Sequence, residues 1–445
     1  MAQLKLFGSA RGGARVAKRG KKDKPARQKK PLKALAIVLT VLLCLEGLYF
    51  LCIYSNIPFI VKYRTIYINT AMNTMRHQWL ATYFIPDNVI DKVRYEYGLQ
   101  VAASNGKESQ WGNAGASAEV TKPTVNEIEA EIVEEEKPDP EEQARLAREA
   151  FFEVFWEIDE ASMDAYVAEH PDVIANGWDS IHINEAGIED EGTNIESIYG
   201  EQVLGIDAAN GVLLLRVKGK GYRGVLAVGK NPAALSVETC STYGTVGQKI
   251  GVTAEEHDGV LAMNASGFLD PGGNGNGGTV AGYAMSNGEE YGSHFTQWAY
   301  KRIELREDNR FYIKDASTPT TESTTDATEF QPAMIIDGVK YTTDVWTDSN
   351  PRACIGQSDK YEILMLVIEG RLWLEGINGT SVNTCSDILL QHRCMQAMNL
   401  DGGSSAMMWF DGKYVMRSSS PDNRYNGGRE CPNAWVYKAA GTFEE

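Results

Sequence analysis

The order of apolar and polar residues divides the chain into three parts. Residues 32–53 form one apolar run with few charges. Polar residues, and then acidic ones, become frequent up to residue 142. A helical spacing of apolar residues follows over Glu141–Ile158, and short apolar runs bounded by glycine occur from Val212 onward. The helical spacing predicts an amphipathic helix, whereas the short runs predict strands.

The apolar run predicts one uncleaved transmembrane helix over residues 32–54. Its length of about 20 residues matches the thickness of a bilayer's hydrocarbon core. It is longer than the apolar region of a signal peptide, and no small-x-small cleavage site precedes Ser55. A buried helix of a soluble domain would not need the dense basic flank that precedes this run.

The charges on either side of the run predict its orientation. The first 33 residues contain twelve Lys or Arg and one acid, Asp23, although the whole chain has a net charge of −17. By the positive-inside rule, residues 1–31 are a basic cytoplasmic segment, and the chain after Ser55 lies outside the cytoplasm. The rest of the chain carries about −28, which argues against nucleic-acid binding.

Three segments separate the predicted membrane helix from the main domain. Residues 55–106 are a membrane-proximal segment to which no chemistry is assigned. Residues 107–142 contain eleven acids and three lysines, a composition that predicts a disordered spacer. Residues 143–189 are expected to form a helical lead-in.

Residues 190–440 combine many strand-like runs with few helical stretches, which lie around Thr245–Glu256 and Asn383–Cys394. This pattern predicts an α+β domain with a mixed sheet rather than regular alternation of strands and helices. The strand-like runs are VLLLRV (212–217), VLAV (225–228), VLAMN (260–264), AMIIDG (333–338), ILMLVIEG (363–370), RLWLEG (371–376), MNLDGG (398–403) and AMMWFDG (406–412).

Two stretches match the G-x-G-x-x-G spacing of dinucleotide-binding loops. The first, with Gly219, Gly221 and Gly224, lies between two strand-like runs and predicts a hairpin. The second, at 273–278, precedes no helix that could hold a pyrophosphate, so it is either the rim of a cleft or a surface loop. Nucleotide binding is therefore not expected.

Seven cysteines and six histidines show no zinc-ligand spacing. The five cysteines after the membrane helix are odd in number, and most are expected to be buried thiols.

Residues that offer chemistry are concentrated in five motifs. Asp401 follows a strand-like run and precedes Gly402 and Gly403, which predicts a strand end with room for a ligand beside the backbone. Alternatively, Asp401 only forms a turn. The motifs are MNASGFLDPGG (263–273), SNPRACIGQ (349–357), LVIEGR (366–371), AMNLDGGSSAMMWFDG (397–412) and NGGRECPNAWVY (426–437).

Four other residues are candidates for binding or catalysis. Arg352 has a planar fork that suits phosphate, although it could instead pair with Asp348. Asn264 and Asn433 could bind sugar hydroxyls or an acetamido group, or else form turns. Glu369 is a second carboxylate for a base or stabiliser, but a hairpin position would explain it equally well.

Ser404 and Ser405 lack the G-x-S-x-G elbow of serine hydrolases, and no histidine has a motif-like setting. Their hydroxyl and N–H groups are expected to donate to phosphate or to orient Asp401. No cofactor is expected. Binding of a calcium ion at Asp401 remains an alternative, because calcium ligands leave little trace in a sequence.

Taken together, the motifs resemble the phosphodiester glycosidase family over about residues 190–440. The NLDGG block is the most specific element, although many members have a third glycine after the aspartate. The resemblance implies a glycosidase that removes a sugar from a phosphodiester. The residues expected to act are Asp401, Arg352 and Glu369 in catalysis, and Asn264, Gly267, Phe268, Gly402, Gly403, Ser404, Ser405, Arg429 and Asn433 in substrate binding.

The sequence therefore predicts a membrane-anchored, extracytoplasmic glycosidase. The anchored layout resembles family members from Gram-positive bacteria, which suggests an N-acetylhexosamine on a phosphodiester in a cell-wall or exopolysaccharide glycan. Phosphate is a good leaving group, so one carboxylate and a phosphate clamp would suffice. Two alternatives remain, a non-catalytic glycan-phosphate binding module and a phosphodiesterase that breaks the phosphorus–oxygen bond.

Overall fold

The computed structural model describes residues 29–74, 77–111, 139–189, 191–271, 274–295, 300–343 and 347–440. It consists of two compact units, Met1–Ile57 and Pro58–Glu445. Most of the basic segment 1–31, Gly273 of the second glycine-rich stretch and residues 112–138 of the expected spacer lie outside the described residues.

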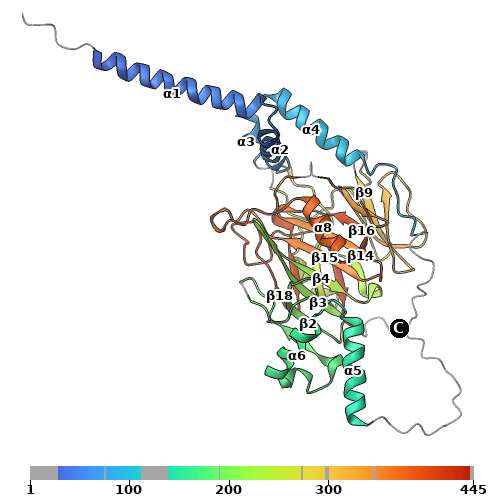
Figure 1. Ribbon diagram of the computed structural model, residues 1–445. Helices are drawn as coiled ribbons and strands as arrows, with labels where there is room; N and C mark the ends of the chain where they lie inside the picture. The colour runs from blue at the N-terminus through green and yellow to red at the C-terminus, as the bar shows by residue number, and fades with distance from the viewer. Residues whose placement is uncertain are drawn as a thin grey trace, which may run out of the picture. The chain divides into compact units, whose positions relative to one another are not determined.

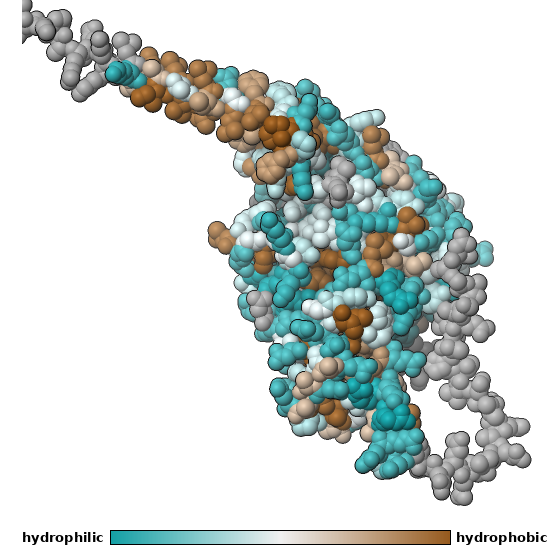
Figure 2. All heavy atoms as spheres, in the orientation of Figure 1, coloured by the Kyte–Doolittle hydropathy of each residue, from teal (hydrophilic) through white to brown (hydrophobic). Residues whose placement is uncertain are grey.

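In the first unit, the expected apolar helix is confirmed as α1 (Lys29–Tyr54). Its apolar side chains are exposed along its length, and Figure 2 shows them as a mostly brown surface. Residues 33–54 are apolar and numerous enough to cross a membrane.

The second unit begins with helices and continues into three sheets (Figure 1). The expected helical stretches around 245–256 and 383–394 correspond to α7 and α8, and the helical pattern at 141–158 corresponds to α5. The helices are α2 (Pro58–Met72), α3 (Trp79–Thr82), α4 (Asp87–Ala102), α5 (Pro140–Val154), α6 (Glu160–Glu169), α7 (Ile250–Glu256) and α8 (Val382–Gln391).

The largest sheet has nine strands in the order β1-β2-β3-β4-β15-β14-β16-β12-β13. The strands β15 and β16 both pair antiparallel with β14, and α8 forms the crossover between them. The strands are β1 (His182–Asn184), β2 (Gln202–Asp207), β3 (Val212–Gly219), β4 (Tyr222–Gly229), β12 (Ala333–Ile336), β13 (Val339–Lys340), β14 (Arg352–Ser358), β15 (Ile363–Ile368) and β16 (Cys394–Asn399).

Two five-stranded sheets complete the unit, in the orders β10-β9-β11-β7-β8 and β18-β17-β6-β19-β5. The strands of the first are β7 (Tyr283–Ser286), β8 (Glu289–Gly292), β9 (Lys301–Arg306), β10 (Phe311–Asp315) and β11 (Thr324–Phe330). The strands of the second are β5 (Leu235–Thr239), β6 (Gly259–Asn264), β17 (Met408–Phe410), β18 (Lys413–Tyr414) and β19 (Asn433–Lys438).

The expected α+β class is confirmed. The strand pairs formed by the described residues are antiparallel, however, where a mixed sheet was expected. Short hairpins favour this arrangement, because antiparallel neighbours can be joined by a two-residue turn. The first G-x-G-x-x-G stretch is such a turn, with Gly219 paired to Tyr222 between β3 and β4.

Both faces of the large sheet are buried, which explains its continuous apolar runs. Along β3, Leu213 and Leu215 pack into one hydrophobic cluster, together with aromatic residues of α5. Leu214, between them, packs into another cluster, which includes Trp435 of β19. The strand period of two therefore sends alternate leucines into two cores.

Two local expectations differ from the structure. Residues 371–376 are not a strand but contain a 3-10 turn, η5 (Trp373–Glu375). Both described ends of the expected disordered spacer 107–142 are ordered, since 140–142 begin α5 and the Trp111 indole donates to the Phe311 carbonyl at 2.7 Å. These contacts were hidden by the acid-rich average composition of the segment.

The expectation of buried thiols is confirmed. Cys240, Cys354, Cys385, Cys394 and Cys431 are all buried and free.

Candidate active site

Asp401 lies just after β16 and just before a 3-10 turn, η6 (Gly403–Ser405). The side-chain amide of Asn264 donates to the Asp401 carbonyl at 2.7 Å, and its oxygen accepts from the Met407 N–H at 3.2 Å. A Cβ on Gly402 would lie 2.6 Å from the Pro351 carbonyl oxygen, so no other residue fits there without a shift. The fold thus fixes the Asp401 backbone and requires a glycine beside it.

The Asp401 carboxyl is electrostatically unusual. Burial raises its pKa to about 6, and Asp270 also raises it. A hydrogen bond from Ser405 and the positive charges of Arg429 and Arg371 act in the opposite direction. The group is therefore ionised at neutral pH in a poorly hydrated setting, as is common for catalytic carboxylates.

Arg371 is a cation that sequence reasoning did not select. It lies just beyond β15 and has a φ of +59°, a conformation that costs free energy for a non-glycine residue. Its guanidinium lies 3.3 Å from where a Cβ of Gly403 would be and donates to Asn350 Oδ1 at 3.1 Å. Burial and the nearby Arg352 charge lower its pKa to about 10, while Asp401 partly offsets them.

Arg429 forms a second positive group near Asp401. Its two terminal nitrogens bind both Asp270 oxygens, at 2.6 and 2.9 Å, and one also donates to the Gly275 carbonyl. Its guanidinium carbon lies 4.5 Å from the centre of the Phe268 ring. The predicted binding residues Phe268 and Arg429 are thus brought together. Arg429 also connects them to Gly275 of the glycine-rich stretch.

Arg352, predicted as a phosphate clamp, is placed in its alternative setting. It binds Asp348 Oδ2 at 2.7 Å and also donates to the carbonyls of Asp348 and Thr380. Asp348 is fully buried and also accepts from Asn350 at 3.1 Å. Because Asn350 binds Arg371 too, Arg352 lies one step behind Arg371 rather than at Asp401.

Glu369, the other predicted carboxylate, is enclosed by two arginines. It pairs with Arg223 at 3.0 Å and with the Arg417 guanidinium at 3.3 Å, and it accepts from the Arg417 N–H at 2.7 Å. Only 2% of its side chain is exposed. This geometry favours a structural role, and its role as a base stays a prediction.

The two predicted asparagines are also buried and occupied. Asn433 accepts from the Ser266 N–H at 3.0 Å and donates to the Ser266 hydroxyl at 3.1 Å, which connects β19 to the segment after β6. Like Asn264, it supports the backbone near Asp401. A Cβ on Gly267 would lie 3.0 Å from the Phe330 ring, so this glycine permits close packing.

The serines differ in their settings. Ser405 is buried and bonds to the Asp401 carboxylate, as the sequence suggested for a serine that orients it. The Ser404 carbonyl accepts from the Ser418 hydroxyl at 3.0 Å and the Arg429 N–H at 3.3 Å. Ser404 thereby connects the turn to the Arg429 loop.

Sequence reasoning missed three groups around Asp401, namely Arg371, Asp270 and Tyr300. Asp270 and Arg371 lie inside the selected motifs, but the sequence does not show that their side chains come near Asp401. Tyr300 precedes β9, outside every motif, and its pKa is raised chiefly by burial and further by Asp401. The described residues contain no cluster of three or more His, Cys, Asp or Glu side chains suited to a metal, and calcium binding stays untested.

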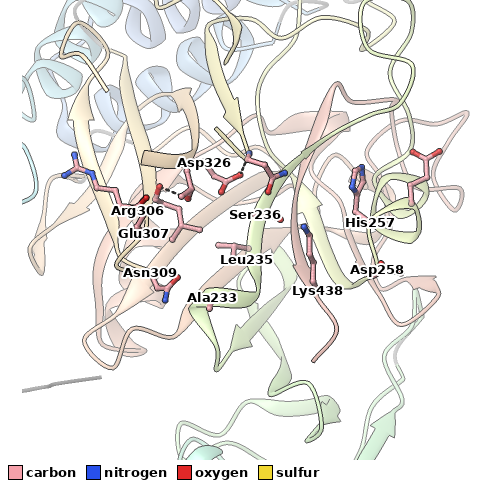
Figure 3. A pocket seen from close by; sticks show the side chains of 14 residues that line it. Ala233, Leu235, Ser236, His257, Asp258, Arg306, Glu307, Asn309, Asp326 and Lys438 are labelled. Atoms are coloured by element: carbon pink, nitrogen blue, oxygen red, sulfur yellow. Dashed lines mark hydrogen bonds between the residues drawn. The ribbon is translucent and has the colours of Figure 1, made fainter. Parts of the chain in front are cut away.

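A separate cavity of about 490 Å³ contains none of the predicted site residues. Figure 3 shows Asp326, His257 and Lys438 among the polar side chains around it. Asp326 accepts from the N–H groups of Val237 and Asn287, yet burial raises its pKa to about 6. The cavity shares no lining residue with the surroundings of Asp401.

Comparison with protein families gives a match to part of the domain. Residues 257–438 match the model of the phosphodiester glycosidase family. The matched region includes Asp401 and the arginines 352, 371 and 429, and it begins just before β6.

The chain is also similar to solved structures, whereas no curated protein matches it. The zebrafish N-acetylglucosamine-1-phosphodiester alpha-N-acetylglucosaminidase catalytic domain, auto-inhibited by its pro-peptide, is 15% identical, with a TM-score of 0.42 over 51% of this chain and 82% of that one. A hypothetical protein from Synechocystis is 14% identical, with a TM-score of 0.34 over 51% and 61%. A putative exported protein from Burkholderia pseudomallei is 12% identical, with a TM-score of 0.36 over 49% and 74%.

Proposed function

We propose that the domain hydrolyses the bond between a sugar and a phosphodiester, with Asp401 as the essential carboxylate. The family match supports this class of reaction. The observation that carries the proposal is the setting of Asp401, a partly exposed carboxylate beside two glycines that interacts with two arginines. A carboxylate that can stabilise positive charge on the sugar and arginines that can bind the phosphate thus lie close together.

Asp401 would act on the sugar. Cleavage at an anomeric carbon passes through an oxocarbenium-like transition state, which a nearby carboxylate stabilises. The phosphate departs as a stable anion, so the reaction places little demand on a general acid. Ser405, through its hydrogen bond, would hold the Asp401 carboxylate in position as the bond breaks.

Arg371, rather than Arg352, would contact the phosphate. Its charge is disfavoured by burial and by Arg352, so an arriving anion would relieve an unfavourable interaction. Arg352 has little freedom to rotate toward a substrate, because it is bonded to Asp348 and Thr380. Its role in this proposal is to position Arg371 through Asp348 and Asn350.

The proposal extends to the place of action and the sugar. Helix α1 and the basic residues before it support a membrane anchor, with the domain outside the cytoplasm. The motif resemblance supports an N-acetylhexosamine on a cell-wall or exopolysaccharide phosphodiester. Protease added to intact cells should degrade the domain, and a domain protected until the membrane is broken would contradict this topology.

The function is tested by incubating the full-length protein with a panel of sugar phosphodiesters and identifying the products by mass spectrometry. We expect free sugar and a phosphomonoester of the other group. A sugar phosphate would indicate a phosphodiesterase, and saturable binding without products would indicate a binding module. Asp401→Asn should remove turnover, whereas Asp422→Asn, at an exposed loop position, should retain it.

A further inference from the structure

The exposed aromatic residues of the second unit are concentrated on α2, α3 and the residues next to them. Outside them, Tyr95 of α4 is exposed, and the described residues from 100 to 440 contain only two large exposed aromatics, Trp373 and Tyr425. The six residues, called here the aromatic face, are Phe59, Tyr63, Tyr67, Trp79, Tyr83 and Phe84, with exposed fractions from 43% to 80%.

Helix α2 has an aromatic side that is exposed. Phe59, Tyr63 and Tyr67 are four residues apart and share the exposed side, where the rings of Phe59 and Tyr63 lie 4.7 Å apart. The buried residues of α2 are the polar Thr65 and Asn69 and the apolar Ile68 and Ala71. A helix that exposes aromatic rings to its surroundings and buries polar groups is unusual in water, and it points to an apolar partner.

The aromatic face is held together as one surface. The Tyr67 hydroxyl donates to the Leu80 carbonyl at 2.7 Å, which joins α2 to α3. The rings of Trp79 and Tyr83 lie edge to face, with their centres 6.3 Å apart. Residues from both helices can therefore meet the same partner together.

We propose that the aromatic face rests in the interfacial region of the lipid bilayer that α1 crosses. Only three residues separate the end of α1 at Tyr54 from Pro58, so the chain itself keeps Pro58, where α2 begins, within about 14 Å of Tyr54. Tyrosine and tryptophan favour the boundary between lipid and water, and Lys62 on the same side can reach the lipid phosphates. The inference rests on the proposed membrane anchor and is independent of catalysis.

The C-terminal end of α2 contacts the segment before Arg352. The Asn73 amide, just after α2, donates to Asp348 Oδ2 at 2.8 Å, and the Ser349 N–H donates to the Thr70 hydroxyl at 3.2 Å. Arg94 of α4 donates to Asn73 at 2.7 Å. Because Asp348 also holds Arg352, a bilayer that fixes α2 would hold the site at a set height above the lipid surface.

The proposal is tested with fluorescent labels on full-length protein in phosphatidylcholine vesicles that contain lipid spin-labelled near the headgroup. Cys44 and Cys52 are exposed on α1 and are first replaced by alanine, whereas the other five cysteines are buried. A single cysteine is then introduced by Tyr63→Cys or Tyr83→Cys. Tyr425→Cys, at a residue 54% exposed and far along the chain, is the matched control.

We expect spin-labelled lipid to quench the labels at 63 and 83 at least about three-fold more than the label at 425, and aqueous iodide to show the reverse order. Equal iodide quenching at all three positions, with no lipid quenching, would overturn the proposal. Protection from iodide without lipid quenching would also overturn it and would indicate a protein partner. Turnover is not part of the readout, so failure here leaves the glycosidase proposal intact.

Discussion

Replacing Arg371 should make the protein more stable and less active. The pKa of Arg371 falls from its ordinary value to about 10 through burial and the Arg352 charge. This difference corresponds to about 3 kcal/mol of unfavourable free energy for keeping Arg371 charged in the folded state at pH 7. Arg371→Gln removes that cost and gives up one hydrogen bond to Asn350, which contributes about 1 kcal/mol.

The expected net result is a gain of about 2 kcal/mol in the free energy of unfolding, measured by urea denaturation at pH 7. The sign follows from linkage. A base with a depressed pKa destabilises the folded state at every pH below that pKa, and the effect disappears only as the pH rises past the ordinary value. Hydrolysis of a sugar phosphodiester should meanwhile fall by about 100-fold or more in kcat/KM, as for loss of a main electrostatic group.

Arg352→Gln is the matched control, because the two arginines are neighbours with different partners. It leaves the fully buried Asp348 without its positive partner, which should cost about 3–5 kcal/mol of stability. If Arg371→Gln instead loses more than about 1 kcal/mol of stability, Arg371 is a structural residue and the argument is wrong. Full activity on charged substrates in Arg371→Gln would equally refute its role at the phosphate.

Three further outcomes are expected. The rate of hydrolysis should rise as pH increases through about 6, where Asp401 ionises, and a pH profile without that limb would remove Asp401 from the reaction. Glu369→Gln should lower the free energy of unfolding by about 3–5 kcal/mol, because Arg223 and Arg417 lose their shared partner, and lost turnover at unchanged stability would support Glu369 as a base instead. Asp326→Asn should raise the free energy of unfolding by about 1–3 kcal/mol at pH 7 and by almost nothing at pH 4. The reason is that a carboxyl with a raised pKa destabilises the folded state as pH rises from its ordinary pKa of 3.8 through 6. Equal effects at both pH values would contradict this.

The sequence predicted the elements whose pattern is local. The apolar run gave α1, and the runs at 212–217, 225–228 and 363–370 gave central strands of the large sheet. These strands are buried on both faces, and a continuous apolar run is typical of such strands, so they could be recognised from the sequence. Strands such as β9 (Lys301–Arg306) were missed because charged residues are buried there, for example Arg302 paired with Glu304 at 2.7 Å.

The site was predicted in part, because a motif shows which residues lie close in sequence but not where their side chains point. Asp401 and its glycines were readable, since a strand followed by Asp-Gly-Gly predicts a turn with open backbone. The choice between Arg352 and Arg371 was not readable. It depends on Asp348, which binds Arg352 only when the residues after α2, the start of β14 and the turn after β15 pack together.

The central claim is that the domain breaks the bond between the anomeric carbon and the phosphate oxygen. Hydrolysis in water enriched in ¹⁸O tests it most directly, with the phosphomonoester product examined by mass spectrometry. Attack at carbon leaves the phosphate unlabelled, and this is the predicted result, with no product from Asp401→Asn under the same conditions. Incorporation of ¹⁸O into the phosphate would show attack at phosphorus and would contradict the account.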